Sequence, residues 1–204
     1  MIKKKRWKRA TYYSILIILG IILFLTILNY FLREEFYLNE EEERALLEFF
    51  PKEHLNKITW YEGGVISWGA SKIFFNNVYI NPRTKPQFAN RSSIASQSLL
   101  VHEAMHTWQS RKGGYIKMDI EALYYQFISF LKYGSRNYAY LYSINQSIES
   151  LHVEQEAELV NDYFSLKYEP GKFYIFCTDC ENLSIDDLIP IYDVKVKEIF
   201  DRYD

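Results

Sequence analysis

The stretch LLVHEAMHTWQ, residues 99–109, decides how the rest of the chain is interpreted. It contains an HExxH pattern, in which His102 and His106 lie four positions apart and Glu103 follows the first histidine. On an α-helix, positions i and i+4 share one face, so both imidazoles can reach one metal ion. Glu103 is rotated away from that face, where it can accept a proton from a zinc-bound water. The pattern therefore predicts a helix that carries a Zn²⁺ site and a general base.

The residues around this pattern support a helix there. Ser92 or Ser93 can cap it, and Gly113-Gly114 can end it after about Lys112. Residues 118–133 would form a helix with apolar residues nearly all round its axis, which predicts a core helix. The further elements expected toward the C-terminus are helices over about 118–133, over about 148–168 and after Ser184, and a strand over 173–177.

A catalytic zinc site needs three protein ligands and one open position. The metzincin continuation HExxHxxGxxH would place glycine and histidine where Gln109 and Lys112 stand, so that class is excluded. Gluzincin sites take a glutamate from a later helix, and Glu154 and Glu158 share a face of such a helix. One of them can bind zinc while the other accepts a hydrogen bond from a histidine ring. Glu156 faces elsewhere, and we expect it to be solvated.

Two sequence stretches resemble known families. His102-Glu103-x-x-His106 with Glu154-x-x-Ala157-Glu158 resembles the HExxH…ExxAD pairing of gluzincin peptidases related to the Ste24/HtpX group. VHEAMHTWQ and LHVEQEAELVNDYF look even more like a family of small bacterial HExxH domains with HExxHxWQ and EQxAxIVxDYF motifs. The resemblance implies Zn²⁺, with Glu154 as third ligand and Glu103 as base. Position 158 departs from the Ste24-like pattern, because it is Glu in place of Asp.

Amide hydrolysis also needs a group that stabilises an oxyanion. Tyrosines that follow the HExxH helix are candidates, and each can equally be a packed ring. The candidates are Tyr138, Tyr140, Tyr142 and Tyr163. Glu158 and Asp162 are candidates to brace a metal-binding histidine.

Residues 10–32 form an uncharged apolar run, ATYYSILIILGIILFLTILNYFL. As a helix it would be roughly 35 Å long, enough to cross a hydrocarbon core of about 30 Å. Basic residues precede the run and acidic residues follow it, so the positive-inside rule places residues 1–9 in the cytoplasm and 33–204 outside. A cleaved signal peptide is the alternative, but its apolar region is usually only about 7–15 residues long. The sequence therefore predicts a single-pass signal-anchor in the cell membrane, with a basic cytoplasmic tail.

The charge distribution argues against nucleic acid as a partner. The formal net charge is −2, and six of the 24 basic residues lie within residues 3–9. The remaining 18 basic residues are outnumbered by 26 acidic ones. A nucleic-acid-binding surface needs a basic patch. We therefore expect the partners to be the membrane and a peptide or protein substrate.

The expected fold class is α+β, a helix-dominated zincin-like domain with a small β-sheet, preceded by one transmembrane helix. Residues 33–56 are acidic and then amphipathic, which predicts a juxtamembrane helical segment with a solvated glutamate run, residues 40–43. Residues 57–81 are rich in β-branched and aromatic residues, which predicts two or three short strands. One of them, residues 73–80, is either an edge that pairs with an extended peptide or a core hairpin. Residues 57–204 would form the zinc metallopeptidase-like domain.

Two histidines and both cysteines stand outside the expected site. His54 lies in an expected loop, and His152 precedes Glu154 by two positions, the wrong spacing for a shared helix face. We expect both histidines at the surface. Cys177 and Cys180 form a CxxC motif without the βαβ context of a thioredoxin-like site. Outside the cytoplasm they are expected to form a local disulfide or to remain free thiols.

These features together predict a membrane-anchored zinc-dependent hydrolase, and above all a metallopeptidase. A different class of function is a non-catalytic, zinc-stabilised, membrane-tethered binding module, against which the intact Glu103 argues, because a structural site has no use for a general base. Hydrolysis of a non-peptide amide or ester is a further enzymatic alternative, since the motif alone does not select the substrate.

Overall fold

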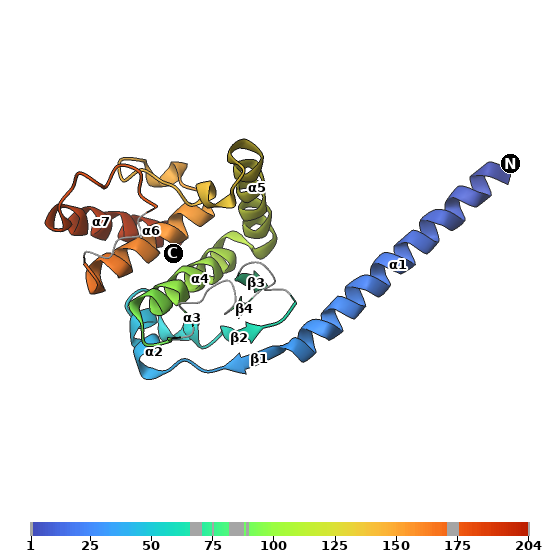
Figure 1. Ribbon diagram of the computed structural model, residues 1–204, viewed down its shortest axis with the longest axis horizontal. Coiled ribbons are helices and arrows are strands. Elements are labelled where there is room, and N and C mark those ends of the chain that lie inside the picture. The colour runs from blue at the N-terminus through green and yellow to red at the C-terminus, as the bar shows by residue number, and fades with distance from the viewer. Residues whose placement is uncertain are drawn as a thin grey trace.

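The chain folds as a helix-dominated α+β structure with a small sheet and one long apolar helix at its N-terminal end, as its sequence predicts (Figure 1). The computed structural model describes residues 2–65, 71–74, 76–81, 88, 90–170 and 176–203. Its elements in chain order are α1 (Ile2–Leu32), β1 (Arg33–Phe36), α2 (Glu40–Leu47), α3 (Lys52–Leu55), β2 (Thr59–Gly63), β3 (Lys72–Phe74), β4 (Asn77–Ile80), α4 (Ile94–Gly113), α5 (Tyr115–Tyr133), η2 (Arg136–Ala139), η3 (Ile148–Ser150), α6 (Val153–Tyr168) and α7 (Ile185–Tyr203).

Helix α1 extends away from the rest of the chain (Figure 1). Its stretch Tyr12–Leu32 has a mean hydropathy of 2.8, so it is long and apolar enough to cross a membrane or to serve as a signal sequence. The helix runs directly into β1. The Gly64 amide donates to the Leu32 carbonyl over 2.8 Å, and the Arg33 guanidinium lies 4.2 Å from the centre of the Tyr61 ring. These contacts join α1 to the sheet without a linker.

The sheet has four strands in the order β1-β2-β4-β3. Strand β2 pairs antiparallel with β1 and parallel with β4, and β3 pairs antiparallel with β4. The strands expected within 57–81 are therefore present, although residues 66–70 and 75 lie outside the described residues. Residues 33–36 were expected in a helical segment but form β1, because Arg33 pairs with Gly63 and Phe36 with Trp60 across the sheet.

Helix α4 is the central element of the fold. Ser93 caps it through a hydrogen bond from the Ser96 amide, as the sequence predicts, and residues 96–110 are buried all round. Helix α4 contacts α2, α5, α6 and α7, and also strand β3. Figure 1 shows α4 between the sheet and α6. The polar side chains of α4 are thus enclosed on every side, and each needs a partner.

Helix α5 is not the core helix that its composition suggested. Only Met118 and Ser129 of its 19 residues are buried, whereas Ile116, Leu123 and Leu131 are each at least 60% exposed. The helix packs on α4, α6 and η2. Its apolar residues surround the axis, so most of them face away from the core.

One glutamate of the run 40–43 is fully buried, against the expectation of a solvated face. Glu42 receives hydrogen bonds from the Asn39 amide at 2.8 Å and from Arg91 Nε at 2.7 Å. Asn39 caps α2 in return by accepting from the Glu42 amide. The charge of Glu42 is therefore compensated where helix α2 begins.

Both histidines expected at the surface are buried. The ring of His54 lies 4.9 Å from that of Trp108, and its Nε2 is 2.8 Å from Thr107 Oγ1. Thr107 donates its own proton to the Ala104 carbonyl, so His54 Nε2 is the donor to Thr107. His152 caps α6 and stacks on Tyr125. Each imidazole packs on an aromatic ring, and His54 also has a polar partner, none of which local sequence spacing indicated.

The two cysteines form a disulfide, Cys177–Cys180, which was one of the two expectations for them. Cys177 pairs with Tyr142 in an isolated bridge, and Asp179 accepts hydrogen bonds from Ser143 and from the Ile144 amide. Residues 173–175 of the expected strand lie outside the described residues. The turn that holds the disulfide is thus tied to the segment before η3.

Candidate metal centre

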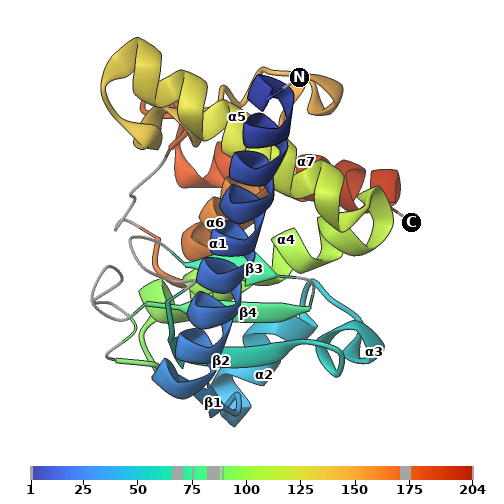
Figure 2. The same ribbon diagram turned by 90° about the vertical axis from the view of Figure 1, so that its right-hand side faces the viewer.

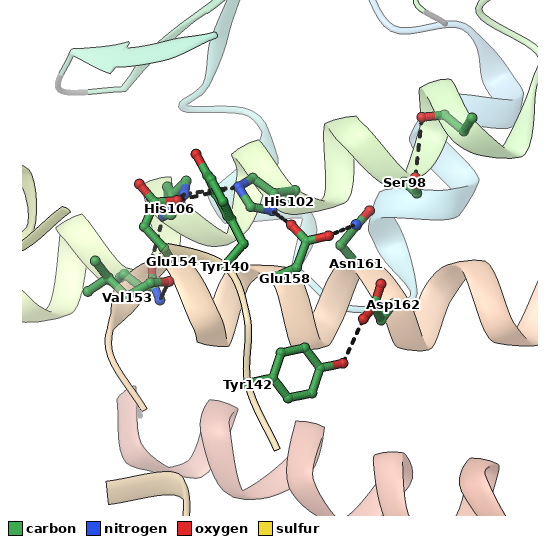
Figure 3. Close-up of polar contacts among 12 residues, drawn as sticks. Ser98, His102, His106, Tyr140, Tyr142, Val153, Glu154, Glu158, Asn161 and Asp162 are labelled. Atoms are coloured by element: carbon green, nitrogen blue, oxygen red, sulfur yellow. Dashed lines mark hydrogen bonds and ion pairs between the residues drawn. The ribbon is translucent and has the colours of Figure 1, made fainter. Parts of the chain in front are cut away.

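Helices α4 and α6 bring three ligand atoms together (Figure 3). His102 and His106 lie on successive turns of α4, and Glu154 lies in the first turn of α6. His106 Nε2 is 3.2 Å from His102 Nε2 and 3.2 Å from Glu154 Oε2, and His102 Nε2 is 3.8 Å from the same oxygen. All three side chains are buried. The structure therefore holds a group that can bind a metal ion.

Gln109 fixes the tautomer of His106. The amide nitrogen of Gln109 donates to the Val153 carbonyl at 3.0 Å and to the Glu156 carboxylate at 2.8 Å. Its oxygen must then be the atom 2.8 Å from His106 Nδ1, so Nδ1 carries the proton of the neutral ring. The free lone pair of His106 is on Nε2, which faces the ligand cluster.

Glu158 does the same for His102. Its Oε2 lies 3.0 Å from His102 Nδ1, and its Oε1 accepts a hydrogen bond of 2.7 Å from Asn161. A carboxylate accepts only, so His102 Nδ1 donates and His102 Nε2 presents a lone pair. Helix spacing alone left open which glutamate faces the metal site, and the family resemblance implied Glu154. The structure places Glu154 in the ligand cluster and Glu158 behind His102.

While both rings are neutral, the three converging atoms cannot satisfy one another. With both Nδ1 atoms protonated, two imidazole lone pairs and a carboxylate oxygen face each other, so the cluster favours a positive charge between them. The other oxygen of Glu154 is already bound by Gln126, at 2.6 Å. Ligands about 2.0–2.1 Å from a tetrahedral ion are about 3.3 Å apart. The observed separations of 3.2, 3.2 and 3.8 Å are close to that spacing.

The pKa values of His106 and Glu154 also indicate that the cluster favours a positive charge. Burial lowers the pKa of His106, but Glu154, with Glu103 and Gln109, outweighs burial and raises that pKa to about 9. Burial raises the pKa of Glu154, but His106, with His102 and Gln126, outweighs it and lowers that pKa to about 2. The pair attracts a proton when no ion is present. A metal ion satisfies all three donor atoms at once, whereas a proton on His106 serves only its neighbour.

A cavity of about 260 Å³ opens beside the three ligands. Glu103 lines it together with residues of β3 and α5, and the ring of Tyr140 lies 6.1 Å from that of His102. The residues around the cavity are Ser71, Ile73, His102, Glu103, His106, Met118, Asp119, Ala122, Leu123, Gln126, Tyr140 and Glu154. Glu103 thus stands beside the ligand cluster without belonging to it.

Other candidates lie away from this cavity. The Tyr142 hydroxyl donates to Asp162 at 2.7 Å, one turn beyond Glu158, and burial raises the pKa of Asp162 well above its usual value. Asp162 therefore meets a tyrosine in place of a histidine. Tyr163 donates to Asp193 of α7, and the exposed ring of Tyr138 stacks on that of Tyr133. Among the four tyrosines proposed from sequence, Tyr140 is the one that lines the cavity.

Glu156 is buried, although it was expected to be solvated. It forms an ion pair with Arg202 and accepts hydrogen bonds from Gln109 and from Tyr203 at 2.7 Å. It therefore links α4 and α6 to α7 and completes the support behind His106. No spacing rule signals this role, because its partners lie far from it in the sequence, on α4 and α7.

Two glutamines near the ligands were not identified from the sequence. Gln109 follows His106 by three positions, so helix spacing could have placed it beside that histidine. Gln126 has no such signal, because it reaches Glu154 from α5. Only the packing of α5 in the folded structure brings Gln126 to Glu154.

Comparison with known proteins gives little beyond this geometry. No family model matches the chain, and no solved structure matches it. An 80-residue stretch is 31% identical to part of the type VI secretion system spike protein VgrG2b of Pseudomonas aeruginosa. That stretch covers 39% of this chain and 8% of the spike protein.

Proposed function

We propose that the chain is a membrane-anchored, zinc-dependent hydrolase of the gluzincin type with a zincin-like fold, and that it acts on peptide bonds. The observation that carries the proposal is the arrangement of His102, His106 and Glu154 around one point, with Glu103 at the edge of the same cavity. A structural zinc site is usually closed by four protein ligands. Within the described residues, three donors converge here next to an open cavity.

Zinc is the metal that this donor set favours. Two imidazole nitrogens and one carboxylate oxygen are ligands typical of catalytic zinc sites. The supports behind the ligands suit a divalent cation, because Glu158 and Gln109 hold the two rings with Nε2 inward. Bound there, zinc would polarise a substrate carbonyl and make a water molecule easier to deprotonate.

The protein's own groups supply the remaining steps. Glu103 is rotated off the ligand face, so its carboxylate can take a proton from the attacking water and pass it to the leaving amine. Tyr140 reaches the cavity from the segment after η2 and is our candidate donor to the oxyanion. Gln126 holds Glu154 by one oxygen, which leaves the other to face the cluster.

A peptide substrate is favoured by the sheet. β3 is an edge strand, and its residue Ile73 lines the cavity beside the ligands. An extended peptide can pair with such an edge through main-chain hydrogen bonds, which does not depend on its side chains. This geometry supports peptides over small amides or esters as substrates.

The anchor is the second part of the proposal. The excess of basic residues before the apolar stretch of α1, Tyr12–Leu32, favours a cytoplasmic N-terminus and a catalytic domain on the outer side of the cell membrane. The disulfide Cys177–Cys180 fits such an oxidising compartment.

A Glu103→Gln variant separates a hydrolase from a zinc-stabilised binding module. We expect the purified full-length variant to retain one zinc ion while cleavage of a denatured protein substrate falls by at least about 100-fold. The matched control is Glu121→Gln on α5, whose side chain does not line the cavity. Equal cleavage by the Glu103 variant and wild type would overturn the assigned base, and zinc without any cleavage by wild type would favour the binding module.

A further inference from the structure

Helix α5 presents a wide apolar face that nothing in the described chain covers. Its seven members, each at least 53% exposed, are Ile116, Ile120, Leu123, Tyr124, Phe127, Phe130 and Leu131. At 3.6 residues per turn they fall within an arc of about 120° that contains no charged residue. A contiguous exposed apolar face of this kind marks a binding surface for a protein or a membrane. We call these seven residues the α5 apolar face.

The composition of α5 fits a helix that lies on a membrane better than one that crosses it. Charged residues flank the α5 apolar face, and Lys117 and Lys132 are both exposed, near the two ends of the helix. Among the described residues, α1 is the helix that is long and apolar enough to cross a bilayer, and α5 is not. Amphipathic helices with lysines beside an apolar face, and with aromatic residues on it, lie in the plane of the bilayer interface.

The position of α5 in the fold indicates which membrane it would meet. Figure 1 shows α5 at the edge of the domain from which α1 departs, and Figure 2, which looks at that side, shows both helices on it. The direction of α1 is set by contacts with the sheet. The Gly64 amide binds Leu32, and Arg33 donates to the Tyr79 hydroxyl at 2.9 Å. A bilayer that holds α1 therefore lies on the α5 side of the domain.

We propose that α5 lies in the interfacial region of the bilayer that holds α1, with the α5 apolar face in contact with lipid. This inference rests on the membrane anchor of the proposed function. The side of α5 turned toward α4 forms one wall of the cavity, through Met118, Asp119, Ala122 and Gln126, and Leu123 at the edge of the α5 apolar face lines it too. The ligand cluster would then stand about one helix diameter, about 10 Å, above the membrane. Substrates would be peptide segments that lie on the bilayer or emerge from it.

Spin labels on the full-length chain in phosphatidylcholine vesicles test the contact. One nitroxide is placed by Phe127→Cys on the α5 apolar face, one by Phe24→Cys in α1, and one by Glu198→Cys on the exposed side of α7. The native cysteines are disulfide-bonded and do not react. Power saturation with oxygen and with a water-soluble nickel chelate reports whether each label lies in lipid or in water.

We expect the labels at Phe127 and Phe24 to be accessible to oxygen and several-fold less accessible to the nickel chelate than the label at Glu198. A Phe24 label in lipid with a Phe127 label in water would overturn the α5 contact and leave the anchor intact. A Phe24 label in water would overturn the anchor itself. Spin–spin broadening at Phe127 that disappears on dilution with unlabelled chain would show a second copy on this face, and would also overturn the proposal.

Discussion

Gln109 offers the sharpest test of how the ligand cluster is held. Gln109→Leu removes three hydrogen bonds. The His106 Nδ1 proton loses its acceptor, and the Val153 carbonyl and the Glu156 carboxylate each lose a donor. Glu156 keeps Arg202 and Tyr203 as partners, so one buried donor, His106 Nδ1, is left without an acceptor. With about 1 kcal/mol for each of the two neutral hydrogen bonds and about 1.5–3 kcal/mol for the one to the Glu156 carboxylate, we expect a stability loss of about 3.5–5 kcal/mol.

The same substitution should weaken zinc binding. A ring that is free to turn or to change tautomer binds the metal less well, and loss of such a support typically costs about 10–100-fold in affinity. Affinity is measured by competition with a chromophoric chelator, and stability by urea unfolding in EDTA. The matched control is Gln97→Leu, on the same helix about 18 Å away along its axis. A zinc affinity within threefold of wild type in Gln109→Leu would refute this account of His106.

Three further predictions concern pH, the junction of α1 and metal removal. Burial and Arg111 lower the pKa of His54 to about 4, so the unfolded chain takes up a proton near pH 6.5 that the folded chain does not. Between pH 7 and pH 5 the wild type should therefore lose about 2 kcal/mol more stability in urea unfolding than His54→Gln, and parallel losses would contradict this. At Gly64 the backbone φ is +86°, and an added Cβ would lie 2.5 Å from Asn29 Oδ1. A positive φ alone is expected to cost about 1–2 kcal/mol of stability. Gly134→Ala measures that cost, because nothing lies within 4 Å of its added Cβ, and Gly64→Ala should cost more. Equal losses in the two variants would exclude a close contact with α1. Zinc at 100-fold excess over its Kd stabilises the folded chain by about 2.7 kcal/mol. EDTA should therefore lower the Tm of the zinc-loaded chain by roughly 5–10 °C and leave the Tm of His106→Ala unchanged.

Local sequence patterns predicted the parts of the fold that depend on local rules. The cap at Ser93 and the pair Gly113-Gly114 set the ends of the HExxH helix, and i, i+4 spacing put His102 and His106 on one face. The apolar run before Arg33 likewise predicted a long helix at the N-terminal end. In each case the interactions involved lie within a few residues of one another along the chain.

The misses come from contacts between distant segments. Residues 33–36 form a strand because β2 is there to pair with them, which the acidic composition did not indicate. Glu156 is buried because Arg202, 46 positions away, compensates its charge. The exposure of α5 also depends on packing, because its sequence is apolar on both sides and only the final position of α4 and α6 decides which side is covered.

The metal content of the purified full-length chain tests the central claim most directly. Wild type, Glu154→Ala and the exposed control Glu149→Ala are loaded with zinc, washed with a weak chelator and analysed for all first-row metals by mass spectrometry, after circular dichroism has shown each to be folded. The account predicts one zinc ion per chain in wild type and in Glu149→Ala, and almost none in Glu154→Ala. Folded wild-type protein without zinc, or full zinc content in Glu154→Ala, would contradict it.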